Sequence, residues 1–122
     1  MACRRVLLID DEDDIREIAQ LSLEMVARWD VVTARSGAEG LSRAAVDQPD
    51  AIVLDVMMPE MDGPTTFSRL RANPQTQHIP VVLLTATTPA PRRDLAQLSV
   101  IQKPFDPMRL PGQIAAALGW SA

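Results

Sequence analysis

Five polar side chains stand at or just beyond the ends of short aliphatic runs in this sequence. Asp10 and Asp11 close the first run, Asp55 and Thr85 close two later runs, and Lys103 lies just beyond the last. In open parallel α/β sheets, ligands bind at the carboxyl ends of the strands. Three carboxylates, one hydroxyl and one ammonium are therefore expected together at one edge of a sheet.

Such a set of side chains has a definite chemistry. Two carboxylates about 4 Å apart repel each other by on the order of 4 kcal/mol at an effective dielectric constant of about 20. A divalent cation removes this repulsion, and a small set of oxygen ligands suits Mg²⁺. The ammonium and the hydroxyl can bind phosphoryl oxygens, while one carboxylate acts as a nucleophile. The pattern predicts Mg²⁺-dependent phosphoryl transfer to an aspartate.

The side chains can meet only if the aliphatic runs form parallel strands. The runs are continuous rather than alternating, as expected of strands that are covered on both faces. They comprise residues 6–9, 51–54, 81–84 and 100–101, and residues 31–33 are a weaker candidate that is expected at a sheet edge.

The segments between the runs carry helical signals. A first helix is predicted over about residues 14–28, because five side chains fall on one helical stripe: Ile15, Ile18, Ala19, Ser22 and Val26. Ser36 and Glu39 match a capping box, in which both side chains satisfy free N–H groups at the start of a second helix.

Two later helices begin at turns that contain proline. Asp62-Gly63-Pro64 opens a third helix, which Asn73-Pro74 ends. The last helix is predicted to begin at Asp106-Pro107, or only at Pro111 with a looser turn before it. Strand and helix thus alternate from end to end, which predicts a single doubly wound α/β domain over residues 1–122.

The composition is that of an ordinary globular protein. The chain has 122 residues and a formal net charge of −4, so it offers no basic surface for nucleic acid. Its single cysteine and single histidine exclude an internal disulfide and a His/Cys metal cluster. No apolar run is long enough for a signal peptide or a membrane span, so a cytoplasmic protein without membrane contact is expected.

Four motifs carry a family resemblance. They are Leu8-Ile9-Asp10-Asp11-Glu12, Leu54-Asp55-Val56-Met57-Met58-Pro59-Glu60-Met61-Asp62-Gly63, Leu84-Thr85-Ala86 and Lys103-Pro104-Phe105. In this order and over the whole chain, the motifs resemble the receiver domain of two-component response regulators. The resemblance implies a stand-alone, chemotaxis-regulator-like receiver domain with no output domain. The implied fold is a flavodoxin-like five-stranded parallel sheet with strand order 2-1-3-4-5 and helices on both faces.

The resemblance also implies the roles of the acidic residues. Asp55 is the expected phosphoacceptor, and Mg²⁺ is the expected cofactor. Asp11 would bind the ion directly and Asp10 mainly through water. Asp55 and the backbone carbonyl of Met57 would complete the protein ligands.

The remaining site residues are expected to bind the phosphoryl group. Thr85 and Lys103 would contact its oxygens, with a cis bond between Lys103 and Pro104, while the small Ala86 keeps the approach to Asp55 open. The implied donor is a sensor histidine kinase or a histidine phosphotransfer protein. Phosphorylation would change the surface that binds an unidentified downstream protein, and the chain would be a monomer or a phosphorylation-dependent dimer. Its own chemistry would be limited to self-phosphorylation and slow hydrolysis, so it is not expected to be an enzyme in the ordinary sense.

Two features depart from the family pattern. Val100 stands where the family usually has Tyr or Phe, three residues before the lysine. The segment between Thr85 and Lys103 is shorter than usual, and Pro89 and Pro91 predict a shortened fourth helix. Both departures concern the output surface.

Other interpretations of the acidic residues stay open. Residues 10–12 could merely cap the first helix. A Mg²⁺-dependent phosphatase or phosphotransferase would commonly place a second acid two residues after its nucleophile, where Met57 stands. A constitutive adaptor of receiver fold is the third possibility. Met57 and Thr87 would flank the water that attacks the phosphoryl group, and an apolar Met57 cannot orient that water, which predicts a long-lived phosphoryl group.

Overall fold

The computed structural model describes residues 4–58, 61–85 and 99–120. Strands and helices alternate along most of these residues, as the sequence predicts. In chain order the elements are β1 (Arg5–Ile9), α1 (Asp13–Met25), β2 (Asp30–Ala34), α2 (Gly37–Asp47), β3 (Ala51–Asp55), α3 (Gly63–Ala72), β4 (Val81–Thr85), β5 (Ser99–Gln102) and α4 (Leu110–Leu118).

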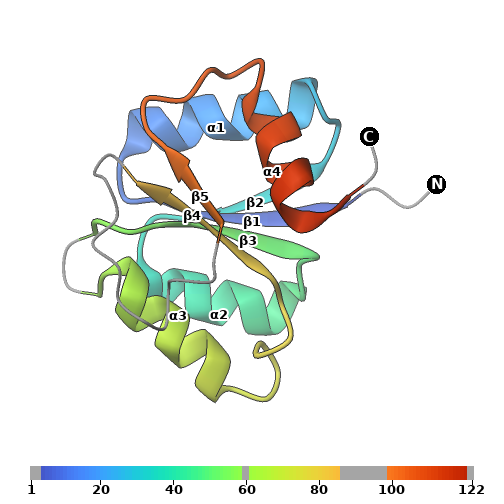
Figure 1. Cartoon of the computed structure of the whole chain (residues 1–122). Coiled ribbons are helices and arrows are strands. Elements are labelled where there is room, and N and C mark those ends of the chain that lie inside the picture. The colour runs from blue at the N-terminus through green and yellow to red at the C-terminus, as the bar shows by residue number, and fades with distance from the viewer. Residues whose placement is uncertain (1–3, 59–60, 86–98, 121–122) are drawn as a thin grey trace.

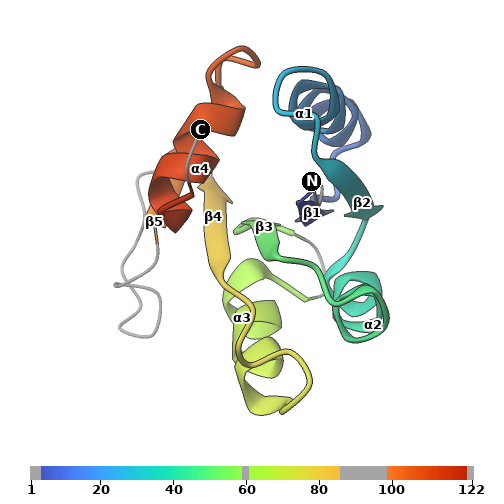
Figure 2. The ribbon, with the colours of Figure 1, turned by 90° about the vertical axis from the view of Figure 1, so that its right-hand side faces the viewer.

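The described strands form one parallel sheet with the order β2-β1-β3-β4-β5. Figures 1 and 2 show α1 and α4 on one face of this sheet and α2 and α3 on the other. The arrangement confirms the predicted doubly wound, flavodoxin-like fold with strand order 2-1-3-4-5. The weaker strand candidate in the sequence is β2, and it lies at an edge of the sheet as expected.

Each face of the sheet packs against its helices through an aliphatic core. Leu7 of β1 belongs to a cluster with Leu70 of α3, whereas its neighbour Leu8 belongs to a cluster with Leu23 of α1 and Ile114 of α4. Successive side chains of a strand point to opposite faces, so a strand covered on both faces is apolar at every position. The continuous aliphatic runs of the sequence are the consequence.

The predicted capping residues begin α2 and α3. The Ser36 side chain accepts a hydrogen bond from the backbone N–H of Glu39 at 3.1 Å, and the Glu39 carboxylate accepts one from the backbone N–H of Arg35 at 3.1 Å. The Asp62 side chain accepts a hydrogen bond from the Thr65 N–H at 2.9 Å at the start of α3. The bonds to Ser36 and Asp62 satisfy N–H groups that the helix itself leaves unpaired, and the bond to Glu39 holds the residue before the Ser36 cap.

The first helix is shorter than predicted and is rotated about its axis. α1 ends at Met25 instead of residue 28, and Arg28 has a φ of 59°, which a right-handed helix cannot continue. The buried residues of α1 are Ala19, Ser22 and Leu23, while Ile18 and Val26 of the predicted stripe are each 44% exposed. Leu23 is therefore buried in the core, whereas Ile18 and Val26, which the prediction placed there, are exposed.

The last helix begins late, as the second of the two predicted starts requires. α4 starts at Leu110, and a turn precedes it in which the N–H groups of Met108 and Arg109 donate to Asp106. The Ser22 hydroxyl of α1 donates to the Pro107 carbonyl and joins this turn to the first helix. The sequence also predicts a shortened fourth helix between β4 and β5, which is a different helix from α4. Its residues, 87–98, lie outside the described residues.

Gly63 holds the loop that follows β3 close to the first turn of α3. Its N–H donates to the Val56 carbonyl at 2.9 Å. A Cβ at this position would lie 2.6 Å from the Asp55 carbonyl oxygen and 2.7 Å from the Val56 Cα. Both neighbours are backbone atoms, so a side chain at residue 63 must push the end of β3 away.

We therefore expect Gly63→Ala to lower the free energy of unfolding by about 1–3 kcal/mol, because it overpacks a contact between backbone segments. Urea unfolding measures the change. Gly112→Ala is the matched control, since a Cβ at that helical position meets nothing within 4 Å. This control should be neutral or raise stability by up to about 1 kcal/mol. Equal effects of the two substitutions would contradict the close contact at Gly63.

Candidate functional site

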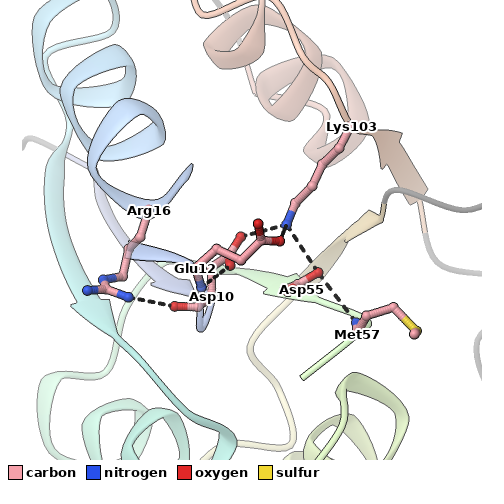
Figure 3. Close-up of polar contacts among 6 residues, drawn as sticks. All are labelled: Asp10, Glu12, Arg16, Asp55, Met57 and Lys103. Atoms are coloured by element: carbon pink, nitrogen blue, oxygen red, sulfur yellow. Dashed lines mark hydrogen bonds and ion pairs between the residues drawn. The ribbon is translucent and has the colours of Figure 1, made fainter. Parts of the chain in front are cut away.

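The carboxyl ends of four strands bring the predicted polar side chains to one edge of the sheet. Asp10 directly follows β1 and is fully buried, and Asp55 ends β3 with 2% of its surface exposed. Thr85 ends β4 and is fully buried, and Lys103 directly follows β5. Figure 3 shows Asp10, Asp55 and Lys103 pointing toward one another.

The Lys103 ammonium lies at the centre of this group. Its Nζ is 2.9 Å from Asp10 Oδ2, 3.4 Å from Asp55 Oδ1 and 3.4 Å from Glu12 Oε1. The lysine side chain is only 7% exposed. The peptide bond between Lys103 and Pro104 is cis, as the resemblance implied. The backbone N–H of Lys103 donates to the Thr85 carbonyl at 2.7 Å, which fixes the lysine to the end of β4.

Four acidic residues of the described chain could hold a metal ion. One carboxylate oxygen from each lies within 4.8 Å of the others: Asp10, Asp11, Glu12 and Asp55. Asp11 Oδ1 and Asp55 Oδ2 are buried and have no hydrogen-bond partner in the described part of the chain. A buried carboxylate oxygen without a partner is costly, and a hard cation with oxygen ligands would satisfy both atoms. The donor set therefore fits a divalent ion such as Mg²⁺.

Two contacts position the first acids, and one of them comes from Arg16, which the sequence did not single out. Arg16 of α1 donates to the Asp10 carbonyl at 2.9 Å and to the Asp13 carboxylate at 2.6 Å. The backbone N–H of Glu12 donates to Asp10 Oδ1 at 2.9 Å. A positively charged side chain in the first turn of a helix interacts unfavourably with the helix dipole. The position of Arg16 is therefore the feature of the sequence that could have indicated its local contacts.

Met57 contacts the Asp55 carboxylate through its backbone and not through its side chain. Its N–H donates to Asp55 Oδ1 at 3.4 Å, while its side chain is 64% exposed and extends away from the carboxylates in Figure 3. The role of the Met57 carbonyl as a metal ligand stays a prediction.

The remaining predicted positions divide between described and undescribed parts of the chain. Asp55 pairs in register with Leu84, so Thr85 lies one residue beyond Asp55 along the neighbouring strand. Val100 is half-buried and packs against the core on the face covered by α2 and α3. Ala86 and Thr87 lie outside the described residues.

The charges of the site change the protonation of its members. Burial and the nearby charge of Asp10 raise the pKa of Asp55 to about 7, against a smaller lowering by Lys103. Burial lowers the pKa of Lys103, but the hydrogen bond and charge of Asp10, together with the charges of the other acids, outweigh it, so that pKa is raised. The lysine is therefore a stable cation, and the site disfavours the charged form of Asp55.

Comparisons with known proteins agree with this geometry. A family model described as the response regulator receiver domain matches residues 6–115. The DNA-binding dual master transcriptional regulator RpaA of Synechocystis is 37% identical over 118 residues, which are 93% of this chain and 48% of RpaA. The response regulator PleD of Caulobacter vibrioides is 49% identical over 84 residues, which are 67% of this chain and 18% of PleD. The chain therefore covers less than half of the length of each of these two relatives.

Solved structures of similar fold match the chain almost completely. The chemotaxis protein CheY4 of Vibrio cholerae has a TM-score of 0.86 at 29% identity, and the match covers 95% of this chain and 99% of that one. A response regulator from Desulfuromonas acetoxidans has a TM-score of 0.80 at 26% identity and covers 95% of this chain and 97% of that one. Among the described helices of this chain, none has the length and apolarity needed to cross a membrane.

The raised pKa of Asp55 predicts a pH-dependent stability in the absence of metal. Between the pKa of an unfolded aspartate, about 3.9, and the folded value of about 7, the native state binds more protons than the unfolded state, so stability falls as pH rises. Asp55→Asn removes this loss. We expect the variant to exceed wild type in free energy of unfolding by an amount that grows from pH 5 to pH 8, to at most about 4 kcal/mol.

Urea unfolding in EDTA across this pH range measures the difference. Asp14→Asn, which neutralises an exposed acid at the start of α1, is the control and should follow wild type. A constant difference between Asp55→Asn and wild type from pH 5 to pH 8 would contradict the raised pKa.

Proposed function

The chain belongs to the response regulator receiver domain family of two-component systems, and from that premise we propose that Asp55 accepts a phosphoryl group in the presence of Mg²⁺. The supporting observation is the buried Asp55 carboxylate. One of its oxygens lies 3.4 Å from the Lys103 ammonium, and the other has no hydrogen-bond partner among the described residues. A buried nucleophile beside a fixed cation suits the transfer of a charged group.

The donor in this proposal is a phosphohistidine of a sensor histidine kinase or of a histidine phosphotransfer protein. A bond forms between an Asp55 oxygen and phosphorus as the P–N bond of the donor breaks, and the electron pair of that bond stays on the imidazole nitrogen. The product is an aspartyl phosphate, which water later hydrolyses. Asp10, Asp11, Asp55 and the Met57 carbonyl would hold Mg²⁺, which neutralises charge on the phosphoryl oxygens when it is bound.

Lys103 and Thr85 would bind the transferred group. Lys103 remains protonated because its pKa is raised, so its ammonium can pair with a phosphoryl oxygen. The Thr85 hydroxyl would bind another oxygen and move with it. Because the Thr85 carbonyl accepts a hydrogen bond from the Lys103 N–H at 2.7 Å, a shift of either residue would be passed between β4 and β5. This is how phosphorylation would alter the surface for a downstream protein.

The neighbouring residues favour a switch over a separate enzyme. A phosphatase acting through an aspartyl phosphate would commonly have a second acid at the position of Met57, whose side chain is apolar and 64% exposed. The net charge of −4 favours a protein partner for these residues over nucleic acid. A constitutive adaptor would have no need of the paired lysine and acids, which are costly to bury.

Incubation with acetyl phosphate tests the assignment of Asp55. Wild-type protein with Mg²⁺ should gain the mass of one phosphoryl group, and protein in EDTA should gain it far more slowly, because the charge on the donor is then not neutralised. Asp55→Asn should not be modified at all. Intact-mass spectrometry reads the result, with Asp14→Asn as the control acid. Modification of Asp55→Asn to the level of wild type would contradict the proposal.

The lifetime of the phosphoryl group tests the role of Met57. An apolar side chain at the opening of the site cannot orient the attacking water, so Met57→Asn should shorten the lifetime several-fold. The decay of phosphorylated protein, followed by intact mass after removal of acetyl phosphate, measures this. Met25→Asn changes a methionine that is 75% exposed on α1 and should decay as wild type does. Equal lifetimes of all three proteins would show that Met57 has no such effect.

A further inference from the structure

The Lys103 ammonium is surrounded by carboxylates: among the described residues it donates hydrogen bonds to Asp10 and Glu12 and forms an ion pair with Asp55. An ammonium carries three N–H bonds. Among the described residues, three carboxylates lie within ion-pair distance of it: Asp10 at 2.9 Å, Glu12 at 3.4 Å and Asp55 at 3.4 Å. A phosphoryl oxygen that binds Lys103 therefore competes with these acids for its N–H groups.

The three acids differ in how readily they can give up their contact with Lys103. Asp10 makes the shortest contact and is fully buried, so its departure would leave an unsolvated charge. Asp55 is the residue that carries the phosphoryl group. The Glu12 side chain is 59% exposed, so water can solvate its carboxylate as soon as the contact breaks. Glu12 is the partner that Lys103 can exchange.

The Glu12 side chain contacts Lys103 and does not cap α1. Glu12 is the N-cap residue of α1, but its side chain makes no capping hydrogen bond. It reaches across the site to Lys103 instead, as Figure 3 shows. The backbone of Glu12 is fixed by its N–H bond to Asp10 at 2.9 Å, which keeps the side chain within reach of the lysine. Glu12 therefore stands at the N-cap position of α1 without making the side-chain hydrogen bond of a cap.

We propose that Glu12 is a positioning residue that competes with the phosphoryl group for Lys103. In the unphosphorylated protein it holds the ammonium over the acids, and it sets how strongly a phosphoryl group must bind in order to take its place. This inference rests on the proposed function, because it requires the phosphoryl group to arrive on Asp55.

The experiment measures the binding of beryllofluoride, a tetrahedral mimic of the phosphoryl group, at saturating Mg²⁺. Titrations followed by ¹⁹F NMR of the bound mimic give the apparent affinity of each variant. Glu12→Gln should bind about two- to fivefold more tightly than wild type, the factor that a partly exposed ion pair represents. Asp14→Asn, which removes an exposed acid of the same segment, should bind as wild type does.

A second comparison separates contact with Lys103 from general charge. In a Lys103→Met background, Glu12→Gln should have no effect, because the residue for which the two groups compete is gone. An unchanged or weaker affinity of Glu12→Gln with Lys103 present would overturn the inference, and so would an equal gain without the lysine. If wild-type protein binds no beryllofluoride at saturating Mg²⁺, the proposed function fails first and takes the inference with it.

Discussion

One buried cation among converging acids is the constraint on which the structure depends. Asp10 and Asp55 are almost fully enclosed, and two such carboxylates at one sheet edge repel each other strongly in a medium of low polarity. The Lys103 ammonium offsets this repulsion from a side chain that is itself 7% exposed. The offset is incomplete, because the pKa of Asp55 stays raised to about 7 and two carboxylate oxygens of the site lack hydrogen-bond partners among the residues that the structure describes. The unmet demand for positive charge is what makes the site receptive to a metal ion.

The fold meets this constraint through topology more than through local structure. Lys103 is 93 residues from Asp10 in sequence, yet the parallel order of the sheet places their strand ends on the same side. Parallel strands joined by helical crossovers all deliver their carboxyl ends to one edge. The close approach of Gly63 to the end of β3 then sets the path of the loop that carries Met57.

The parts of this arrangement that depend on strand order were predictable from the sequence. Continuous aliphatic runs mark buried strands, and the polar residue after each run marks the site, so Asp10, Asp55 and Lys103 could be grouped without coordinates. The buried face of α1 could not, because Leu23 and Ile18 are equally apolar and only packing against α4 and the sheet decides between them. The contacts of Arg16 and Glu12 depend on side-chain directions across a turn, which no spacing rule gives.

Substitutions at the buried residues of the site and at its exposed residues have different effects. A change at Asp10, Asp55 or Lys103 alters a buried charge and therefore affects stability and chemistry together. Glu12 and Met57 lie at the opening, where water can replace the contacts that they lose, so substitutions there cost little stability. Under the proposed function, a receiver domain would keep one buried set of reacting groups, and the side chains at its rim would set how readily it is phosphorylated and for how long. That separation follows from solvation alone, because charges in the core must be balanced by the fold, whereas charges at the rim are balanced by water.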